Sequence, residues 1–195
     1  MPRTVTRKAM DFEVSDIYGK TIKLSDFSGR DVILSFFRDT TRPSRNSRIL
    51  ELTRHYQEWS DVGVEIIVVF NDSRSQLKRF FEKRPRPFTV IADPKLELYD
   101  LYGVQRIVGK DLVAPTSLGE KSGISKIFKG GWAWLSPVGR LMPAEFLISP
   151  NGMIAHSWQG RSESDHIPFD RLETFVMSVR VAMRKKALMN KSLSH

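Results

Sequence analysis

The sequence predicts an α/β fold in which a central mixed sheet is flanked by helices. Asp31–Phe37 and Val64–Phe70 are near-continuous apolar runs, as expected of strands buried on both faces of a sheet. Between them, apolar residues recur at spacings of three and four, the period of a helix that lays one face on the sheet. The three segments therefore predict a strand–helix–strand unit whose two strands are parallel.

A hairpin is expected ahead of the first long strand. Short alternation of apolar and polar residues surrounds Tyr18-Gly19-Lys20, where the glycine supplies the turn. The helix after the strand is predicted to begin near Thr41, because Thr41 and Pro43 precede the apolar stripe that runs from Ile49 to Trp59.

The middle of the chain continues the alternation of helices and strands. Leu77, Phe80 and Phe81 predict a second helix, followed by a short strand at Phe88–Ala92. A third helix is expected after that strand, and Gly103 ends it.

The last third predicts an antiparallel hairpin and a final helix. The hairpin consists of strands at Ala144–Ile148 and Met153–Trp158, joined by the turn Pro150-Asn151-Gly152. Pro168 opens the final helix, whose apolar residues recur with helical period before a basic tail at residues 184–195. Residues 104–142 are glycine-rich and predict an insertion or lid loop, in which Trp132 and Trp134 either close over a site or pack against the body.

Length and composition predict one domain over residues 1–195, with a core at about residues 10–185. The 31 Lys and Arg residues exceed the 22 Asp and Glu residues, and the resulting net charge of +9 favours anionic partners without indicating a reaction. The amino terminus lacks the apolar stretch of a secretory signal, and no apolar run approaches a membrane span, so we expect a cytoplasmic protein.

The sequence contains no cysteine, which excludes disulfides, thiolate metal sites and thiol nucleophiles. The four histidines are scattered without the spacing of metal ligands, so structural roles are expected for them, and neither a metal site nor a cofactor is predicted. They are His55, His156, His166 and His195.

The order of elements and several short phrases resemble one known family. Leu24, Phe27 and Gly29 match a Leu-x-x-Phe-x-Gly phrase, and Phe36-Phe37-Arg38-Asp39 leads into the first helix. Met142-Pro143 resembles a cis-proline before a strand. Ser149-Pro150-Asn151-Gly152 and Asp165-His166-Ile167-Pro168 fit the same pattern. The chain thus resembles the peroxiredoxin-like branch of the alkyl hydroperoxide reductase and thiol-specific antioxidant (AhpC/TSA) family. This resemblance implies a thioredoxin-like fold with an amino-terminal β-hairpin and an insertion before the cis-proline strand.

The resemblance fails at the residues that carry the chemistry of that branch. There the Phe-Phe-Arg-Asp phrase is followed by Cys-Pro-x-Cys and then Asn-x-Arg, whereas this chain has Arg42-Pro43-Ser44-Arg45 before Asn46 and Arg48. Arginine therefore stands at both cysteine positions, as Arg42 and Arg45. A guanidinium stays protonated and cannot attack a peroxide, so the sequence predicts a redox-inactive protein with no catalytic residue. The family alternative is a thioredoxin-like antioxidant oxidoreductase or peroxidase.

The two arginines suggest what the vacated site could bind. A helix N-terminus favours anions, and positive side chains in its first turn are placed sensibly if an anion occupies the site. The predicted site comprises Thr41, Arg42, Ser44, Arg45 and Pro143, and its partner is an unidentified protein or a small anionic ligand. The alternative is that both arginines are solvated or paired within the protein, for example with Asp39 or Glu51.

A further alternative involves the carboxyl-terminal segment. From Met177 to His195 there are five basic residues and no acidic one, so this segment could meet nucleic acid or an anionic membrane. The other interpretation is a helix that packs on the core and ends in a frayed, solvated tail. A homodimer also remains open at this point.

Overall fold

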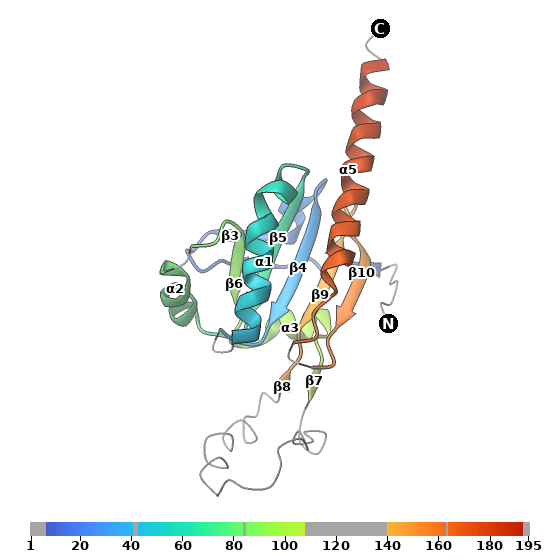
Figure 1. Cartoon of the computed structure of the whole chain (residues 1–195). Coiled ribbons are helices and arrows are strands. Elements are labelled where there is room, and N and C mark those ends of the chain that lie inside the picture. Colours follow the sequence, from blue (N-terminus) through green and yellow to red (C-terminus); the bar gives the residue numbers. More distant parts are fainter. Residues whose placement is uncertain (1–6, 41–42, 84, 108–139, 163, 193–195) are drawn as a thin grey trace, which may run out of the picture.

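A six-stranded mixed sheet forms the centre of the molecule (Figure 1). The computed structural model describes residues 7–40, 43–83, 85–107, 140–162 and 164–192. The strands of this sheet lie in the order β1, β10, β9, β4, β5 and β6. They are β1 (Arg7–Lys8), β4 (Asp31–Phe37), β5 (Val64–Phe70), β6 (Thr89–Ala92), β9 (Ala144–Ile148) and β10 (Met153–Gln159).

Helices and two small sheets complete the fold. The helices are η1 (Leu24–Phe27), α1 (Pro43–Ser60), α2 (Arg74–Glu82), α3 (Glu97–Tyr102) and α5 (Phe169–Ser192). The small sheets pair β2 (Glu13–Ser15) with β3 (Thr21–Lys23), and β7 (Arg106–Ile107) with β8 (Arg140–Leu141).

The predicted strand–helix–strand unit is confirmed. β4 pairs in parallel with β5, and β5 with β6, while β9 runs antiparallel to β4 and returns through β10. All seven residues of β4 are buried, as expected of a strand covered on both faces. The mixed sheet and its flanking helices therefore match the fold class that the sequence predicts.

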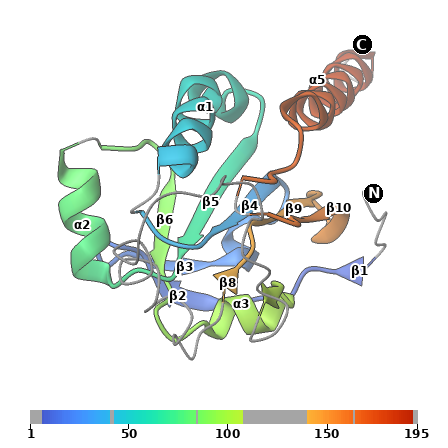
Figure 2. The same ribbon diagram turned by 60° about the horizontal axis from the view of Figure 1, so that its bottom comes forward.

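Alternating residues of the strands feed two separate cores. Val32, Leu34 and Phe36 of β4 point into the core beneath the β2–β3 hairpin and α3. Ile33 and Phe37 point into the core beneath α1, α2 and α5. Figure 2 shows α1 and α5 on one face of the sheet and α3 with the hairpin on the other. Side chains on the odd-numbered positions of β4 therefore face the α1–α5 layer.

The predicted hairpin turn is also confirmed. Gly19 has a φ of +97°, a conformation that side-chain-bearing residues rarely adopt. The Asp16 carboxylate accepts hydrogen bonds from the backbone N–H groups of Tyr18, Gly19 and Lys20 at 2.7–2.9 Å. These bonds give the turn its shape and leave β2 and β3 in antiparallel register.

Two features differ from the sequence prediction, and a third lies mostly outside the described residues. Arg7 and Lys8 form an edge strand on β10, which their exposed polar side chains did not indicate. α5 continues as a helix to Ser192, through most of the segment for which one interpretation was a frayed tail. Of the insertion at residues 104–142, only its two ends are described, where β7 pairs with β8; Trp132 and Trp134 lie outside the described residues.

Candidate functional site

The predicted site lies at the carboxyl end of β4, where the chain crosses to α1. Here the Tyr99 hydroxyl, which has a single proton to donate, lies within hydrogen-bond distance of the Phe37 carbonyl and, at 3.2 Å, of the Val69 carbonyl. Beyond the strand, the backbone N–H of Thr40 donates to the Asp72 carboxylate at 2.7 Å. These contacts tie the ends of β4 and β5 together immediately before α1 begins.

The structure describes the predicted site residues only in part. Thr41 and Arg42 lie outside the described residues. Ser44 and Arg45 belong to the first turn of α1, which has no acidic residue, but their side chains are not described. Pro143 is buried and precedes β9, whose Ala144 is paired with Phe36. Pro143 and the first turn of α1 are therefore at the same end of the sheet.

The expected cis peptide bond is not found. Among the described residues no peptide bond is cis, so Met142–Pro143 is trans. On one side of this bond Met142 donates its N–H to the Gln105 carbonyl, and on the other β9 begins at Ala144. The Pro143 ring instead packs on Gly160, where an added Cβ would lie 2.8 Å from the proline Cγ.

A buried ion pair lies directly behind the first turn of α1. Arg48 is 4% exposed and Glu145 of β9 is fully buried. The Nε and Nη2 atoms of Arg48 lie 3.2 and 3.1 Å from the Glu145 Oε1 atom, and Nη2 also donates to the Ile167 carbonyl at 2.8 Å. The guanidinium is 5.8 Å from the centre of the Phe169 ring. One side chain of α1 therefore reaches both the sheet and the segment that leads into α5.

His166 completes this cluster. Its Nδ1 atom lies 3.3 Å from Glu145 Oε1, and its ring centre is 5.2 Å from that of Phe37. The other carboxylate oxygen of Glu145 accepts the backbone N–H of Ile167 at 2.6 Å. Within the described part of the chain, the buried Nε2 atom of His166 has no hydrogen-bond partner.

The surroundings of Glu145 favour its ionised form. Burial alone raises the pKa of this carboxyl, but the hydrogen bond with His166, the charges of Arg48 and His166 and the Ile167 N–H together hold it below its usual value. The carboxylate and Arg48 thus neutralise one another inside the protein. Arg48, although it follows the predicted site by only three residues, is not available to bind an external anion.

Arg48 and His166 belong to two separate phrases that resemble the family, and nothing in the sequence indicates that they share a partner. The feature of the sequence that indicates a buried ion pair is Glu145, a charged residue inside the apolar strand Ala144–Ile148. Such a residue requires a buried partner, because an unpaired charge in a core is strongly unfavourable. The partner could not be chosen from sequence, since Arg48 precedes Glu145 by 97 positions.

The two acidic residues that the sequence offered as partners of Arg42 and Arg45 have other contacts. Asp39 lies 3.3 Å from the Nε atom of Arg38, and Glu51 lies 3.4 Å from the Nη1 atom of Arg48. Both carboxylates therefore already face an arginine among the described residues.

Comparison with known proteins identifies the family. The sequence profile of the AhpC/TSA family matches residues 5–157. The chain belongs to the AhpC/TSA family. It is 23% identical over 163 residues to the peroxiredoxin Bcp of Bacillus subtilis, an alignment that covers 84% of this chain and 89% of that one. It is 26% identical over 158 residues to the peroxiredoxin Bcp of Escherichia coli, covering 81% and 86% of the two chains. As an AhpC/TSA protein without cysteine, it lacks the thiol of a thiol-dependent enzyme.

Solved structures confirm the thioredoxin-like fold of this AhpC/TSA protein. Peroxidoxin BcpB from Mycobacterium tuberculosis superposes with a TM-score of 0.65 at 15% identity, covering 91% of this chain and 97% of that one. Peroxiredoxin Q from Xanthomonas campestris gives a TM-score of 0.64 at 16% identity, covering 91% and 97%. The expected fold is therefore confirmed.

No helix among the described residues is both long and apolar enough to cross a membrane. No group of three or more histidine, aspartate and glutamate side chains in these residues is arranged to hold a metal ion.

We expect the Arg48–Glu145 ion pair to affect the free energy of unfolding. Arg48→Met leaves the buried Glu145 carboxylate unpaired, and Glu145→Met leaves the guanidinium unpaired, so each should lower the free energy of unfolding by about 3–5 kcal/mol. The double variant should lose much less than the sum, because it leaves neither charge buried alone. Urea denaturation at pH 7 measures all four proteins.

Glu51→Gln is the control for this cycle. Its contact with Arg48 is long and its side chain is 45% exposed, so the expected loss is under about 1 kcal/mol. Losses that simply add in the double variant at pH 7 would contradict this account.

The Glu145 carboxylate also makes the stability of the fold depend on pH. Because its pKa in the folded state is lowered, its contribution to the free energy of unfolding is present above pH 4.5, the ordinary pKa, and is lost as the pH falls through the folded-state pKa.

Proposed function

We propose that this protein is a redox-inactive member of the AhpC/TSA family that binds an anionic group at the N-terminus of α1. The group belongs either to a small anion or to an acidic side chain of a partner protein. One observation carries the proposal: the 195-residue sequence contains no cysteine, and arginine stands at both positions where the related phrase has one.

The absence of both thiols removes peroxide reduction but leaves the strand and helix that surround the site. Reduction of a peroxide by a thiol enzyme requires a thiolate that attacks the O–O bond and is then regenerated. Neither arginine nor Ser44 can follow that cycle, because a guanidinium has no available lone pair and an alkoxide does not pass through a sulfenate. The fold nevertheless retains the strand, the crossover and the helix that would present such a group.

Binding of an anion is supported by the charge at this end of the sheet. α1 is 18 residues long and presents its unpaired N–H groups and the positive end of its dipole here, with no acidic residue in its first turn. Arg48 is neutralised by Glu145, so excess positive charge must come from Arg42 and Arg45. Two cations at a positive helix end are unfavourable in isolation and become favourable when an anion is bound.

Absence of turnover is the first expected result. With hydrogen peroxide and dithiothreitol, the wild-type protein should consume peroxide no faster than the buffer, because no nucleophilic sulfur is present. The matched variant Arg42→Cys/Arg45→Cys, assayed in parallel, shows whether the same frame supports the reaction once thiols are restored. Consumption by the wild-type protein above the buffer rate would reject redox inactivity and favour the oxidoreductase alternative.

Stabilisation by phosphate is the second expected result. Inorganic phosphate should raise the Tm of the wild-type protein in a saturable manner, since a ligand that binds only the folded state stabilises it. Arg42→Gln/Arg45→Gln should abolish the saturable part. Arg54→Gln/Arg79→Gln removes the same charge from exposed positions of α1 and α2 and should leave the response unchanged. An equal response in all three proteins, or none in the wild type, would contradict the anion site.

A second candidate function is association with an anionic lipid surface through α5. The carboxyl-terminal part of this helix projects beyond the body of the molecule (Figure 1). Five of its apolar side chains are 49–69% exposed, which is unusual for a protein whose other large apolar residues are mostly buried. They are Met177, Val181, Met183, Leu188 and Met189.

Charge distinguishes between possible surfaces for α5. Arg184 and Lys185 are exposed among these apolar residues, whereas Arg180 turns back to Glu58 of α1 at 2.6 Å. No acidic residue follows Glu173, so two such segments repel one another and an anionic surface attracts them. Apolar side chains among cations suit a lipid interface better than a nucleic-acid backbone, which has no apolar layer to receive them.

Vesicle sedimentation tests this candidate. The protein should bind vesicles that contain phosphatidylglycerol, bind less at high salt, and not bind pure phosphatidylcholine. Leu188→Gln/Met189→Gln should weaken binding, whereas Met10→Gln/Leu101→Gln, which alters two exposed apolar residues elsewhere, should not. Binding to a duplex DNA that the Leu188→Gln/Met189→Gln substitutions leave unchanged would instead assign α5 to nucleic acid.

A further inference from the structure

A cavity of about 250 Å³ lies between the sheet and the base of α5. β4, β9 and β10 supply one wall, and α5 supplies the other. Its polar lining residues come from both walls and converge on the same space. They are Asp31, Ser149, His156, Arg171, Thr174 and Ser178.

Asp31 is the central feature of this cavity. It is an odd-numbered residue of β4 and therefore points to the α5 side of the sheet, next to Ser149 at the end of β9. The residue is only 8% exposed. Among the described residues, no hydrogen bond or ion pair reaches its carboxylate. A carboxylate that is largely removed from water and has no protein partner is stabilised when a hydrogen-bond donor enters the cavity beside it.

The hydroxyl groups of α5 that line the cavity have already used their protons. Thr174 donates to the Asp170 carbonyl at 2.7 Å, and Ser178 donates to the Phe175 carbonyl at 2.6 Å. Their oxygens are therefore left as acceptors, like the carboxylate of Asp31. A ligand that satisfies these groups must bring hydrogen-bond donors, and a positive charge for Asp31.

We propose that this cavity binds a small organic molecule through an ammonium group held by the Asp31 carboxylate. An ammonium group has three donors and no acceptor, which complements a carboxylate flanked by hydroxyl oxygens. The volume is equivalent to about eight water molecules and restricts the ligand to a few heavy atoms. Arg171, which is exposed, can pair with a carboxylate at the other end of the ligand and repels a second positive charge.

The titration of Asp31 agrees with this geometry. Burial raises the pKa of Asp31 to about 6 from the ordinary 3.8, because the ionised form is poorly solvated. A cation binds the ionised form, so binding lowers that pKa and is itself weakened by acid. With a pKa of about 6, the ionised fraction falls from about nine-tenths at pH 7 to about one-tenth at pH 5. His156 and Arg171 are the cationic or titratable groups that face the same cavity.

This site is separate from the proposed anion site. Asp31 begins β4 and Phe37 ends it, so the seven-residue strand places the two sites about 20 Å apart. The ligand charges are also opposite. Failure of either proposal therefore leaves the other untouched.

An NMR titration of the full-length protein with ethanolamine tests the site. The amide signals of Ser149, Thr174 and Ser178 should shift saturably at pH 7, and the affinity should be about tenfold weaker at pH 5. Asp31→Asn should remove the saturable shifts. This variant should fold, because the amide replaces a carboxylate that burial disfavours, and its Tm at pH 7 should be no lower than that of the wild type.

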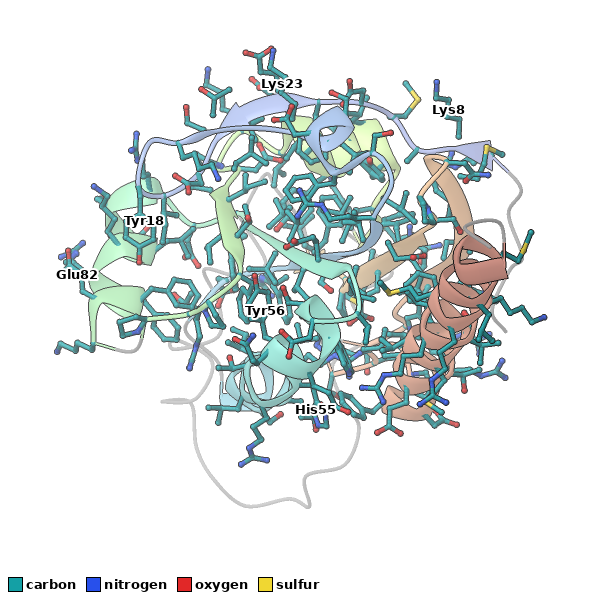
Figure 3. The ribbon with its side chains drawn as sticks, turned by 90° about the horizontal axis from the view of Figure 1, so that it is seen from above. Lys8, Tyr18, Lys23, His55, Tyr56 and Glu82 are labelled. Carbon is teal, nitrogen blue, oxygen red and sulfur yellow. The ribbon has the colours of Figure 1, made fainter. Side chains whose placement is uncertain are left out.

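Two further ligands and one control variant complete the experiment. β-Alanine, which adds a carboxylate, should bind at least as tightly as ethanolamine, and Arg171→Gln should remove any advantage. Acetate, which has no ammonium group, should not bind. Glu82→Gln removes an exposed carboxylate on α2, on the far side of the molecule from α5 (Figure 3), and should behave as the wild type. Binding of acetate alone, unchanged binding to Asp31→Asn, or no saturable shift with ethanolamine would overturn the proposal.

Discussion

The Arg48–Glu145 pair is the contact on which the arrangement of the α1–α5 face depends. Glu145 is fully buried in a strand at the centre of the sheet, where a lone carboxylate could not remain ionised. Its requirement for a cation brings α1 over β9, and its requirement for a second donor fixes the Ile167 N–H. Because Arg48 also donates to the Ile167 carbonyl, the chain enters α5 at one defined position. A purely apolar contact would fix these three segments less specifically.

This pair also determines which charges are available at the vacated thiol site. Arg48 lies on the first turns of α1 but has its charge neutralised from behind by Glu145. The proposed anion site therefore depends on the helix dipole and on Arg42 and Arg45 for its positive charge. In the proposed function, the two arginines attract an anion at the positions where the related phrase has cysteines.

The other functional proposals lie away from this end of the molecule. α5 packs on the sheet through its amino-terminal half, where Leu172 and Val176 are buried, and exposes Val181, Leu188 and Met189 farther along. In the view from above (Figure 3), His55 of α1 lies on the side that faces α5. Its ring is 4.8 Å from that of Phe169. The base of α5 is therefore held by aromatic packing, while the side chains at its far end are exposed.

The sequence by itself determined the sheet, the order of its elements and the absence of thiol chemistry. β4, β5 and β9 have the predicted bounds because an apolar run or alternation is a local property that each segment carries. Tertiary structure alone decided the pairing of Arg48 with Glu145, the trans Met142–Pro143 bond and the isolation of the Asp31 carboxylate. Each of these depends on which distant residues share a volume after folding. Burial, which turns an ordinary aspartate or arginine into a structural or binding group, is a property of that volume and not of the local sequence.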